Sequence, residues 1–518
     1  MGGFNVKTKT IKIFHTSDTH GNITNQSFIN KSISQFSLSK VASYIRKNTD
    51  NNTLIIDTGD TIQGCPLTYY LKDNYSKYNN PISNIFNYIG YDYFIPGNHD
   101  FNYGLDYLQN FTNNLNATTL SCNILTKNDD SFFNKKYDIK IINDIKIAIV
   151  GATTDYINKW ENPKNINGLN ISDTYIAIKK SVQEIKELHK PDLIILAYHG
   201  GIESDFSTNI YTDKNVGENI GYKIFTEVKD IDIILAGHQH RLINYKHNNR
   251  VLVMPGSKGQ ILSEIIVSFD DEGKKITSQL INVDNESHDQ KIIEKNSLII
   301  KDSEVFFDQI IGYNKRNDLL ITNQLDARLN KHKIVTLINN IQLKTTNADI
   351  SATSLANNAF GFNKEITIRD VLNTYVYPNT LVVVEINGIT LKNVLEQYAT
   401  FFIINNDLIT INEKYIKPKL ELYNYVMFEG ISYVINVSKP LGKKVSNLRF
   451  GENTIKDKDV FKLVINNYRA SGAGNENIYE HLKVIKEYPL DISELLIDYI
   501  KANKNIDVIS TNNITIEK

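Results

Sequence analysis

The first half of the chain alternates short apolar runs with longer amphipathic stretches, and this rhythm limits the folds that are open to it. Continuous runs rich in branched residues predict buried strands at residues 11–14, 54–56, 145–150, 193–197 and 231–236. Apolar residues at helical spacing predict helices at residues 39–47, 82–89 and 173–189. Strands that alternate with helices in this way predict an α/β layer fold with a largely buried sheet.

The length of 518 residues exceeds what one hydrophobic core supports, so more than one domain is expected. We expect a first domain at residues 9–281. Residues 282–322 are charged and helical in spacing, and we interpret them as a helical linker. A separate α+β domain is expected at residues 323–518. In it, helices are predicted near 331–343 and 390–399, and strands near 381–386, 433–437 and 461–465.

Five short motifs with ligand-type side chains follow predicted strands. In order they are SDTHG, DTGDTIQG, PGNHDFNYG, AYHGG and AGHQH. Because sites in α/β sheets form beyond the carboxyl ends of strands, these side chains are expected to converge. Carboxylate, imidazole and amide donors without a thiolate favour Mn, Zn, Fe or Co over soft metal ions. One such motif has little meaning alone, but five in this order are hard to explain by chance.

The ligand set is sufficient for two divalent cations that share one carboxylate and activate a water molecule between them. Asp60 is the expected bridging residue. One cation would take Asp60 together with Asp18, His20 and His240, and the other would take Asp60 together with Asn98, His199 and His238. Both sites would keep room for solvent or a substrate oxygen, as catalytic metal sites require.

The order of these motifs resembles that of the calcineurin-like metallophosphoesterases over most of residues 9–270. The resemblance implies a four-layer α/β/β/α sandwich with the same metal ligands. It also implies that His99 stabilises charge on the phosphoryl oxygens or the leaving group. In related 5′-nucleotidases the motif is similar to G-N-H-E-F-D, whose last residue orients the histidine. Asn102 stands there in this chain, so His99 is expected to be less basic or to be assisted by another acid. A purely structural role for His99 is the alternative.

Segments of the second half resemble the C-terminal domain of the 5′-nucleotidase superfamily. They include ADISATSLANNAFG, ITIRDVLNTYVYPNTLVVVEINGITLKNVLE, FEGISYVINVS and INNYRASGAGN. FNYGLDYL after the G-N-H-D core, VYPNTL and NNYRA favour the 2′,3′-cyclic-nucleotide 2′-phosphodiesterase/3′-nucleotidases. The resemblance implies two aromatic rings that clamp the nucleobase, at Tyr425 and Tyr468, with Tyr423 as the alternative to Tyr425. Stacking suits this task because every base presents a π-face.

Two positions depart from the pattern of the 5′-nucleotidases. Gly474 stands where a loop similar to F-L-A-N-G-G-D carries an aspartate near the ribose. Ser351 follows Ile350 where those enzymes have a phosphate-side arginine. Both departures favour a phosphodiesterase/3′-nucleotidase, although they do not determine which ester bond is cleaved.

The resulting hypothesis is hydrolysis of nucleotide phosphoesters by a dinuclear metal centre. The substrates would be 2′,3′-cyclic nucleotides, converted to 3′-nucleotides and then to nucleosides and phosphate. By the resemblance, the linker would permit a domain rotation that carries the nucleotide to the metal ions. Three alternatives stay open: a 5′-nucleotidase or nucleotide-sugar hydrolase, a broad phosphatase for other esters, and a non-catalytic nucleotide-binding or surface protein.

Charge and hydropathy exclude several classes of partner. The formal net charge of −1, from 57 basic and 58 acidic residues, gives no electrostatic footprint for duplex nucleic acid or an anionic membrane. No apolar stretch approaches the length of a membrane span. We expect a monomer with a small-molecule nucleotide substrate, and we expect the two cysteines to be unpaired. The first residues show no secretory signal. The resemblance favours a periplasmic, secreted or cell-surface location, and a cytoplasmic one stays open.

Overall fold

The computed structural model describes residues 8–28, 31–211, 217–377, 379–417, 420–470, 472, 479, 481–488 and 491–518. Gly474 lies outside these residues. The chain divides into two compact units, unit 1 (residues 1–303) and unit 2 (residues 304–518). The boundary falls within helix α8 (Gln290–Phe307). In the described part of the chain, none of the helices combines the length and the apolar character needed to cross a lipid bilayer.

Unit 1 is built around two six-stranded sheets. The first sheet has the order β14-β13-β1-β2-β3-β4. Its parallel strands are β1 (Lys9–Thr16), β2 (Thr53–Asp57), β3 (Tyr93–Phe94) and β4 (Thr118–Thr119). Its antiparallel strands are β13 (Ile261–Asp270) and β14 (Gly273–Asn282).

The second sheet has the order β11-β12-β10-β9-β7-β6. Its four central strands run parallel: β12 (Arg250–Pro255), β10 (Ile233–Ala236), β9 (Leu193–His199) and β7 (Ile145–Thr153). The antiparallel strands β11 (Leu242–His247) and β6 (Tyr137–Ile142) form its edges. The strands predicted from the apolar runs of the first half are therefore present in both sheets.

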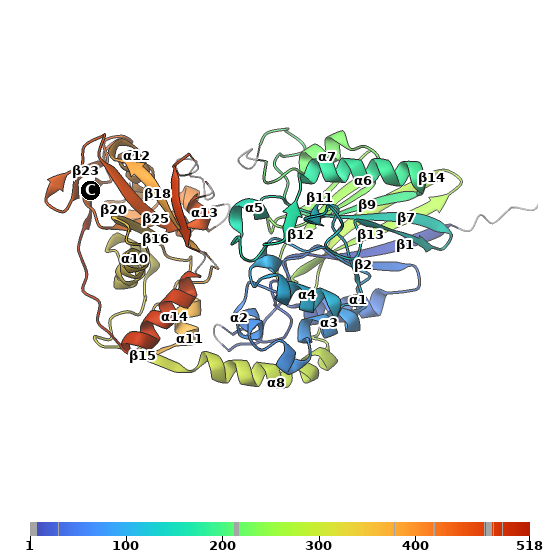
Figure 1. Ribbon diagram of the computed structural model, residues 1–518, viewed down its shortest axis with the longest axis horizontal. Helices are drawn as coiled ribbons and strands as arrows, with labels where there is room; N and C mark the ends of the chain where they lie inside the picture. The colour runs from blue at the N-terminus through green and yellow to red at the C-terminus, as the bar shows by residue number, and fades with distance from the viewer. Residues whose placement is uncertain are drawn as a thin grey trace, which may run out of the picture. The chain divides into compact units, whose positions relative to one another are not determined.

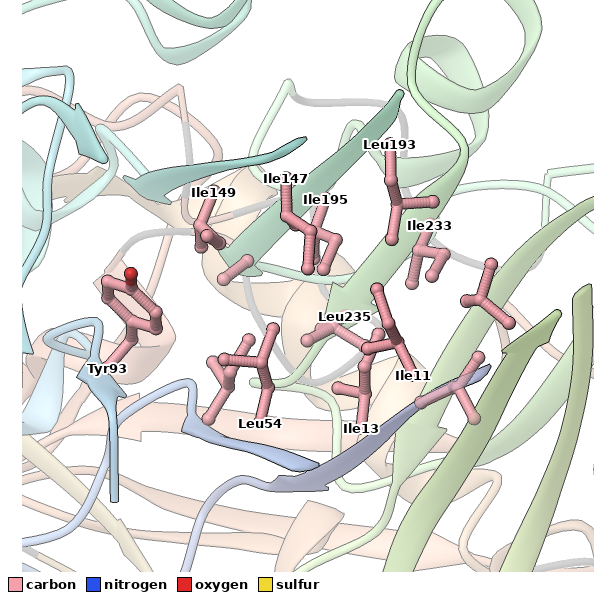
Figure 2. Close-up of a cluster of buried hydrophobic side chains, with 14 of the residues drawn as sticks. Ile11, Ile13, Leu54, Tyr93, Ile147, Ile149, Leu193, Ile195, Ile233 and Leu235 are labelled. Atoms are coloured by element: carbon pink, nitrogen blue, oxygen red, sulfur yellow. The ribbon is translucent and has the colours of Figure 1, made fainter. Parts of the chain in front are cut away.

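An apolar layer joins the two sheets face to face (Figure 2). Ile13 of β1 and Leu54 of β2 contribute from the first sheet, and Ile149, Ile195 and Leu235 contribute from the second; none of the five has measurable solvent exposure. Burying an aliphatic side chain of this size stabilises the fold by about 1.5–3 kcal/mol. This layer is therefore the main core of unit 1, and it fixes the relation between the strand ends of the two sheets.

Helices cover the outer faces of both sheets (Figure 1). On the second sheet lie α6 (Thr174–Leu188) and α7 (Gly221–Glu227), which bury Ile178 and Ile224 against it. On the first sheet lie α1 (Leu38–Asn48), α3 (Pro81–Ile89) and α4 (Leu105–Asn113). Phe94 of β3 packs edge-on against Phe86 of α3 and Phe111 of α4. The order helix, sheet, sheet, helix confirms the four-layer sandwich expected from the sequence.

Unit 2 is a separate, β-rich unit with two larger sheets. One has the order β21-β16-β25-β18-β26 and comprises β21 (Val426–Glu429), β16 (Ile350–Ser354), β25 (Val460–Asn466), β18 (Leu381–Asn387) and β26 (Val484–Tyr488). The other has the order β24-β23-β22-β28 and comprises β24 (Asn453–Thr454), β23 (Val445–Phe450), β22 (Ser432–Asn436) and β28 (Ile514–Glu517). The helices of this unit include α10 (Lys333–Thr346), α12 (Gly388–Ala399), α13 (Asn467–Ala470) and α14 (Ile492–Asn503).

Arg328 ties several loops of unit 2 together. Its side chain is fully buried. The guanidinium donates to the backbone carbonyl oxygens of Leu355 (2.9 Å), Ala356 (2.9 Å) and Leu422 (3.3 Å), and to both oxygens of Gln324. Buried charges persist only when their hydrogen-bonding groups are satisfied. Arg328 therefore orders the segment at Leu422, which precedes the tyrosines predicted to hold the nucleobase.

We expect truncation of a side chain in the apolar layer between the two sheets to destabilise unit 1 more than truncation of an exposed side chain. Ile149→Ala removes a fully buried side chain, and Ile141→Ala removes one on β6 that is 66% exposed. The first change should lower the free energy of unfolding by about 2–5 kcal/mol, and the second by less than about 0.5 kcal/mol. Denaturant unfolding followed by the fluorescence of Trp160, the only tryptophan of the chain, measures both. Equal losses would contradict the packing described here.

Candidate metal centre

The ligand-type side chains predicted from the sequence lie on loops that directly follow parallel strands. The first sheet carries Asp18 and His20 after β1, Asp60 after β2, and Asn98 after β3. The second sheet carries His199 at the end of β9, and His238 and His240 after β10. They meet in two groups whose donor atoms lie within 4.8 Å of one another: Asp18, His20 and His240, and Asp60, His199 and His238.

In the first group, hydrogen bonding directs His20 Nε2 toward its neighbours. His20 Nδ1 donates to the carbonyl oxygen of Gln63 (2.9 Å). Its Nε2 lies 3.0 Å from His240 Nε2, which is 3.3 Å from Asp18 Oδ1. Burial lowers the pKa of His20 to about 4, so the ring is neutral at pH 7, the form that binds metals. Two imidazole nitrogens at this distance need a proton or a cation between them.

Hydrogen bonds also orient the histidines of the second group. His199 Nδ1 donates to the carbonyl oxygen of Thr58 (2.5 Å), and its Nε2 lies 3.1 Å from Asn98 Oδ1. His238 Nδ1 lies 2.9 Å from the same Asn98 oxygen, while its Nε2 contacts Glu218 Oε1 (2.8 Å). Burial opposes protonation of His199, but the Asp60 carboxylate raises its pKa to about 10. The group therefore attracts positive charge.

Asp60 lies between the two groups. Its Oδ2 is 3.3 Å from His199 Nε2 and 4.0 Å from His20 Nε2. This oxygen is buried and has no hydrogen-bond partner among the described residues, whereas Oδ1 accepts from the backbone N–H of His99 (2.7 Å). A buried carboxylate oxygen without a partner is costly unless a cation satisfies it. The donor set and this oxygen therefore fit two divalent cations, and Asp60 is the carboxylate that lies near both groups.

Backbone strain is concentrated at the ligands. Five of these residues have φ between 46° and 74°, the left-handed region that residues with a Cβ rarely adopt: Asp18, His20, Asp60, His238 and His240. Each such residue costs about 1–3 kcal/mol, and such strain clusters at functional sites where the surroundings impose it. The loops are therefore shaped to aim these side chains, and loop stability alone does not account for their conformation.

Asp100 connects the loop of Asp60 to the loop of Asn98. Its Oδ2 accepts from the backbone N–H groups of Asp60 (2.9 Å) and Gly97 (2.8 Å). Its Oδ1 accepts from those of Thr61 (2.8 Å) and Ile62 (2.9 Å). Gly97 leaves room for the Asp60 side chain, because a Cβ at that position would lie 2.2 Å from Asp60 Oδ1. The two loops are thus locked together by one carboxylate.

His99 lies beside the first group, and Asn102 contacts His99. The His99 ring is 5.5 Å from that of His20, and its Nδ1 lies 2.8 Å from Asn102 Oδ1. On the side of the second group, Trp160 at the end of α5 (Ile157–Trp160) stacks on His238, with ring centroids 5.5 Å apart and an interplanar angle of 16°. A titratable ring and an aromatic wall therefore flank the ligand groups.

The structure does not support the expectation that Tyr425 clamps a nucleobase. Its side chain is fully buried, with its ring stacked on Phe401 at 4.9 Å, so it offers no face to a ligand. Tyr468, on α13, is 40% exposed. Arg469 donates from Nη2 to the carbonyl oxygen of Tyr423 (2.6 Å), which joins the backbone of Tyr423 to the element that carries Tyr468. The alternative residue, Tyr423, is the one placed beside Tyr468.

Sequence reasoning missed three residues of the centre. Asp100 lies inside the PGNHD motif, so the motif itself contained a signal for it. Glu218 lies in an irregular segment and Trp160 ends the four-residue helix α5, so no characteristic spacing in the sequence indicated either residue. Glu218 matters because a carboxylate on the far nitrogen of a metal-binding histidine orients the ring and raises its basicity.

Comparisons with known proteins agree with this geometry. Residues 11–242 match the calcineurin-like phosphoesterase family, and residues 311–483 match the 5′-nucleotidase C-terminal domain. The chain is 26% identical to a trifunctional nucleotide phosphoesterase of Bacillus subtilis, over 97% of its own length and 38% of that protein. It is 25% identical to the 2′,3′-cyclic-nucleotide 2′-phosphodiesterase/3′-nucleotidase of Salmonella typhimurium, over 90% of this chain and 82% of that protein. A solved structure of a putative 5′-nucleotidase from Staphylococcus aureus has a TM-score of 0.85 and 29% identity, covering 98% of this chain and 100% of that one.

The four-layer sandwich and its two ligand groups define unit 1 as a calcineurin-like metallophosphoesterase domain, a class that typically uses two metal ions. Unit 2 contains the match to the 5′-nucleotidase C-terminal domain, so the chain combines the two domains of that family. The chain belongs to the 5′-nucleotidase family of nucleotide phosphoesterases, and it is a hydrolase.

Removing the bridging carboxylate should abolish binding of the metal pair. Asp60→Asn keeps the shape of the side chain but replaces the anionic oxygen with an amide group, so we expect less metal per chain and activity at background level. Elemental analysis of the purified protein measures this. Asp173→Asn is the control, because Asp173 caps α6 and asparagine caps a helix equally well. Full metal content in Asp60→Asn would contradict the bridging role.

Glu218→Gln should weaken the second group without removing a ligand. Loss of such a supporting carboxylate typically lowers metal affinity about 10–100-fold. Because Trp160 stacks on His238, its fluorescence should report metal binding in a titration of chelator-treated protein. We expect the titration midpoint to shift to higher metal concentration. An unchanged midpoint would show that Glu218 does not act on His238.

Proposed function

We propose that this protein hydrolyses nucleotide phosphoesters with two divalent metal ions. The metals would be Mn, Zn, Fe or Co, and the principal substrates 2′,3′-cyclic nucleotides, converted to 3′-nucleotides and then to nucleosides and phosphate. The observation that carries the proposal is Asp60 Oδ2, a buried oxygen of the second group that has no hydrogen-bond partner among the described residues and lies 4.0 Å from His20 Nε2 of the first group. The alternative is a 5′-nucleotidase or nucleotide-sugar hydrolase, the class suggested by the relative from Staphylococcus aureus.

Asp18, His20, Asp60 and His240 would hold one cation, and Asp60, Asn98, His199 and His238 the other. When bound, such a pair polarises phosphoryl oxygens and lowers the pKa of water. Other groups of this chain would orient the ligands and the substrate. The backbone N–H of His99 holds Asp60 in place. The His99 ring, which lies beside the first group, would stabilise charge on the phosphate or pass a proton to the leaving oxygen.

The substrate assignment rests on different residues. Asn102 stands where the resemblance to 5′-nucleotidases calls for an aspartate, and the Salmonella relative is named for the cyclic-nucleotide activity. In unit 2, Tyr423 and Tyr468 are proposed to stack on the base. Burial raises the pKa of Tyr423, and Tyr468 contributes to the shift, so the two phenols lie within electrostatic range of each other. Tyr377 lies next to this pair, with its ring 6.1 Å from that of Tyr423.

A substrate panel tests the assignment. The metal-reconstituted protein is assayed with Mn on 2′,3′-cyclic AMP, 3′-AMP and 5′-AMP side by side, with Asp60→Asn as the background. We expect kcat/KM to be highest for the cyclic diester and the 3′-monoester to be hydrolysed next. Hydrolysis of 5′-AMP alone would replace the proposal by the 5′-nucleotidase alternative. No hydrolysis of any phosphoester would favour the non-catalytic alternative.

Tyrosine variants test the base site. Base stacking on an aromatic side chain contributes about 1–3 kcal/mol. Tyr468→Ala and Tyr423→Ala should therefore raise KM for nucleotides by roughly 5–150-fold, without slowing turnover of bis(p-nitrophenyl) phosphate, which has no base. Tyr425→Phe is the matched control, because it keeps the buried ring and should leave KM unchanged. Unchanged KM in both alanine variants would favour a phosphatase for other esters.

A further inference from the structure

A buried acid lies behind Asn102. Glu161, the residue directly after α5, is 9% exposed. Its Oε2 accepts from Asn102 Nδ2 (2.6 Å), and its Oε1 accepts from the backbone N–H of Asn162 (2.7 Å) and from Asn165 Nδ2 (2.9 Å). Asn165 Nδ2 also donates to the backbone carbonyl of Asn102 (2.8 Å). Each of these three hydrogen bonds to the carboxylate comes from an amide group, so Glu161 is placed as an ionised acceptor.

This contact determines which way the amide of Asn102 points. An asparagine amide can turn over and present either its oxygen or its nitrogen to a neighbour. A carboxylate accepts hydrogen bonds only, so Glu161 selects the orientation in which Nδ2 faces it. Oδ1 then faces His99 Nδ1 at 2.8 Å. Because an amide oxygen also only accepts, Nδ1 of His99 must carry the hydrogen, and Nε2 is the ring nitrogen left for the substrate.

We propose that Glu161 is a positioning residue that sets the orientation and the tautomer of His99 through Asn102. An aspartate at position 102 would select the same tautomer alone, because both of its oxygens accept. With an amide at position 102, selection of the His99 tautomer needs an anion that contacts Asn102 on the side away from the ring. Glu161 is that anion. The catalytic consequence rests on the proposed function, but the hydrogen-bond relay is a property of unit 1 that can be measured without substrate.

Glu161→Gln separates this proposal from a purely structural role. The backbone N–H of Asn162 and the amide of Asn165 both need an acceptor, so the oxygen of the new glutamine should turn toward them. Its NH₂ would then face Asn102 and draw the Asn102 oxygen to itself. The Asn102 NH₂ would face His99, whose Nδ1 becomes the acceptor and whose hydrogen moves to Nε2. The single variant should therefore carry the inverted tautomer.

A second change should reverse the inversion. In Asn102→Asp combined with Glu161→Gln, the aspartate accepts from the glutamine NH₂ and from His99 Nδ1–H at the same time. The Nδ1–H tautomer should return, although the carboxylate now stands at position 102 and not at position 161. If Glu161 served only to order the segment at residues 161–165, the double variant would behave no better than Glu161→Gln.

The readout is NMR of the imidazole nitrogens in protein labelled with ¹⁵N-histidine and loaded with Zn²⁺, at a pH where the ring is neutral. His99→Asn identifies the resonances. We expect the Nδ1–H form in the parent and in the double variant, and the Nε2–H form in Glu161→Gln. In parallel, kcat for 2′,3′-cyclic AMP should fall about 10–100-fold in Glu161→Gln with KM little changed, and recover in the double variant.

Glu396→Gln is the matched control. Glu396 is also buried and also accepts three N–H groups, those of Gly442, Lys444 and Val445, but it lies in unit 2. It should leave the His99 resonances and kcat unchanged. An Nδ1–H ring in Glu161→Gln, or no recovery in the folded double variant, would overturn the proposal. If tautomers change as expected but no nucleotide is hydrolysed, the proposed function fails and the relay stands.

Discussion

The centre of unit 1 depends on one buried carboxylate that binds no metal in our interpretation. Asp100 accepts four backbone N–H groups, three from the loop of Asp60 and one from Gly97 in the loop of Asn98. Backbone N–H groups left unpaired in the interior would cost about 1–3 kcal/mol each. One side chain therefore satisfies both loops and fixes Asp60, the proposed bridging residue, relative to Asn98, a proposed ligand.

This arrangement explains how strained ligands persist. Asp18, His20 and Asp60 adopt left-handed backbone conformations that their own side chains disfavour. The cost is offset by bonds that strand ends alone do not provide: Asp18 N donates to the carbonyl of Gly59, and His20 N donates to that of Asp60. The loops after β1 and β2 thus hold each other, and the apolar layer between the sheets holds the strands from which they emerge. The side chains of these residues are thus oriented at a cost in local backbone stability, as is usual at functional sites.

The sequence was sufficient for the layers and for the two groups of side chains that the structure brings together, because both follow periodic or ordered patterns. Branched apolar runs mark β1, β7 and β9, and each ligand motif follows its strand within a few residues. The supporting residues were out of reach for a physical reason. Glu161 and Glu218 act through other side chains from irregular segments, so no spacing relates them to His99 or His238. Tyr425 and Tyr423 differ by two positions, and only the packing on Phe401 shows which ring is buried.

The electrostatics of the centre explain why a nucleotide phosphoesterase can have an almost neutral chain. Asp18 and Asp60 are the only carboxylates of the proposed ligand set, and the histidines and the amide beside them carry no negative charge. Two divalent cations would outweigh them, leaving a positive surplus for the phosphate inside a buried site where charges interact strongly. No cation is then needed at position 351, where Ser351 is buried with its Oγ 2.8 Å from Asn339 Oδ1 and 2.7 Å from Gln342 Oε1. In the proposed function, selectivity for nucleotides over other phosphates comes from the rings of unit 2, because the metal ligands recognise only the ester.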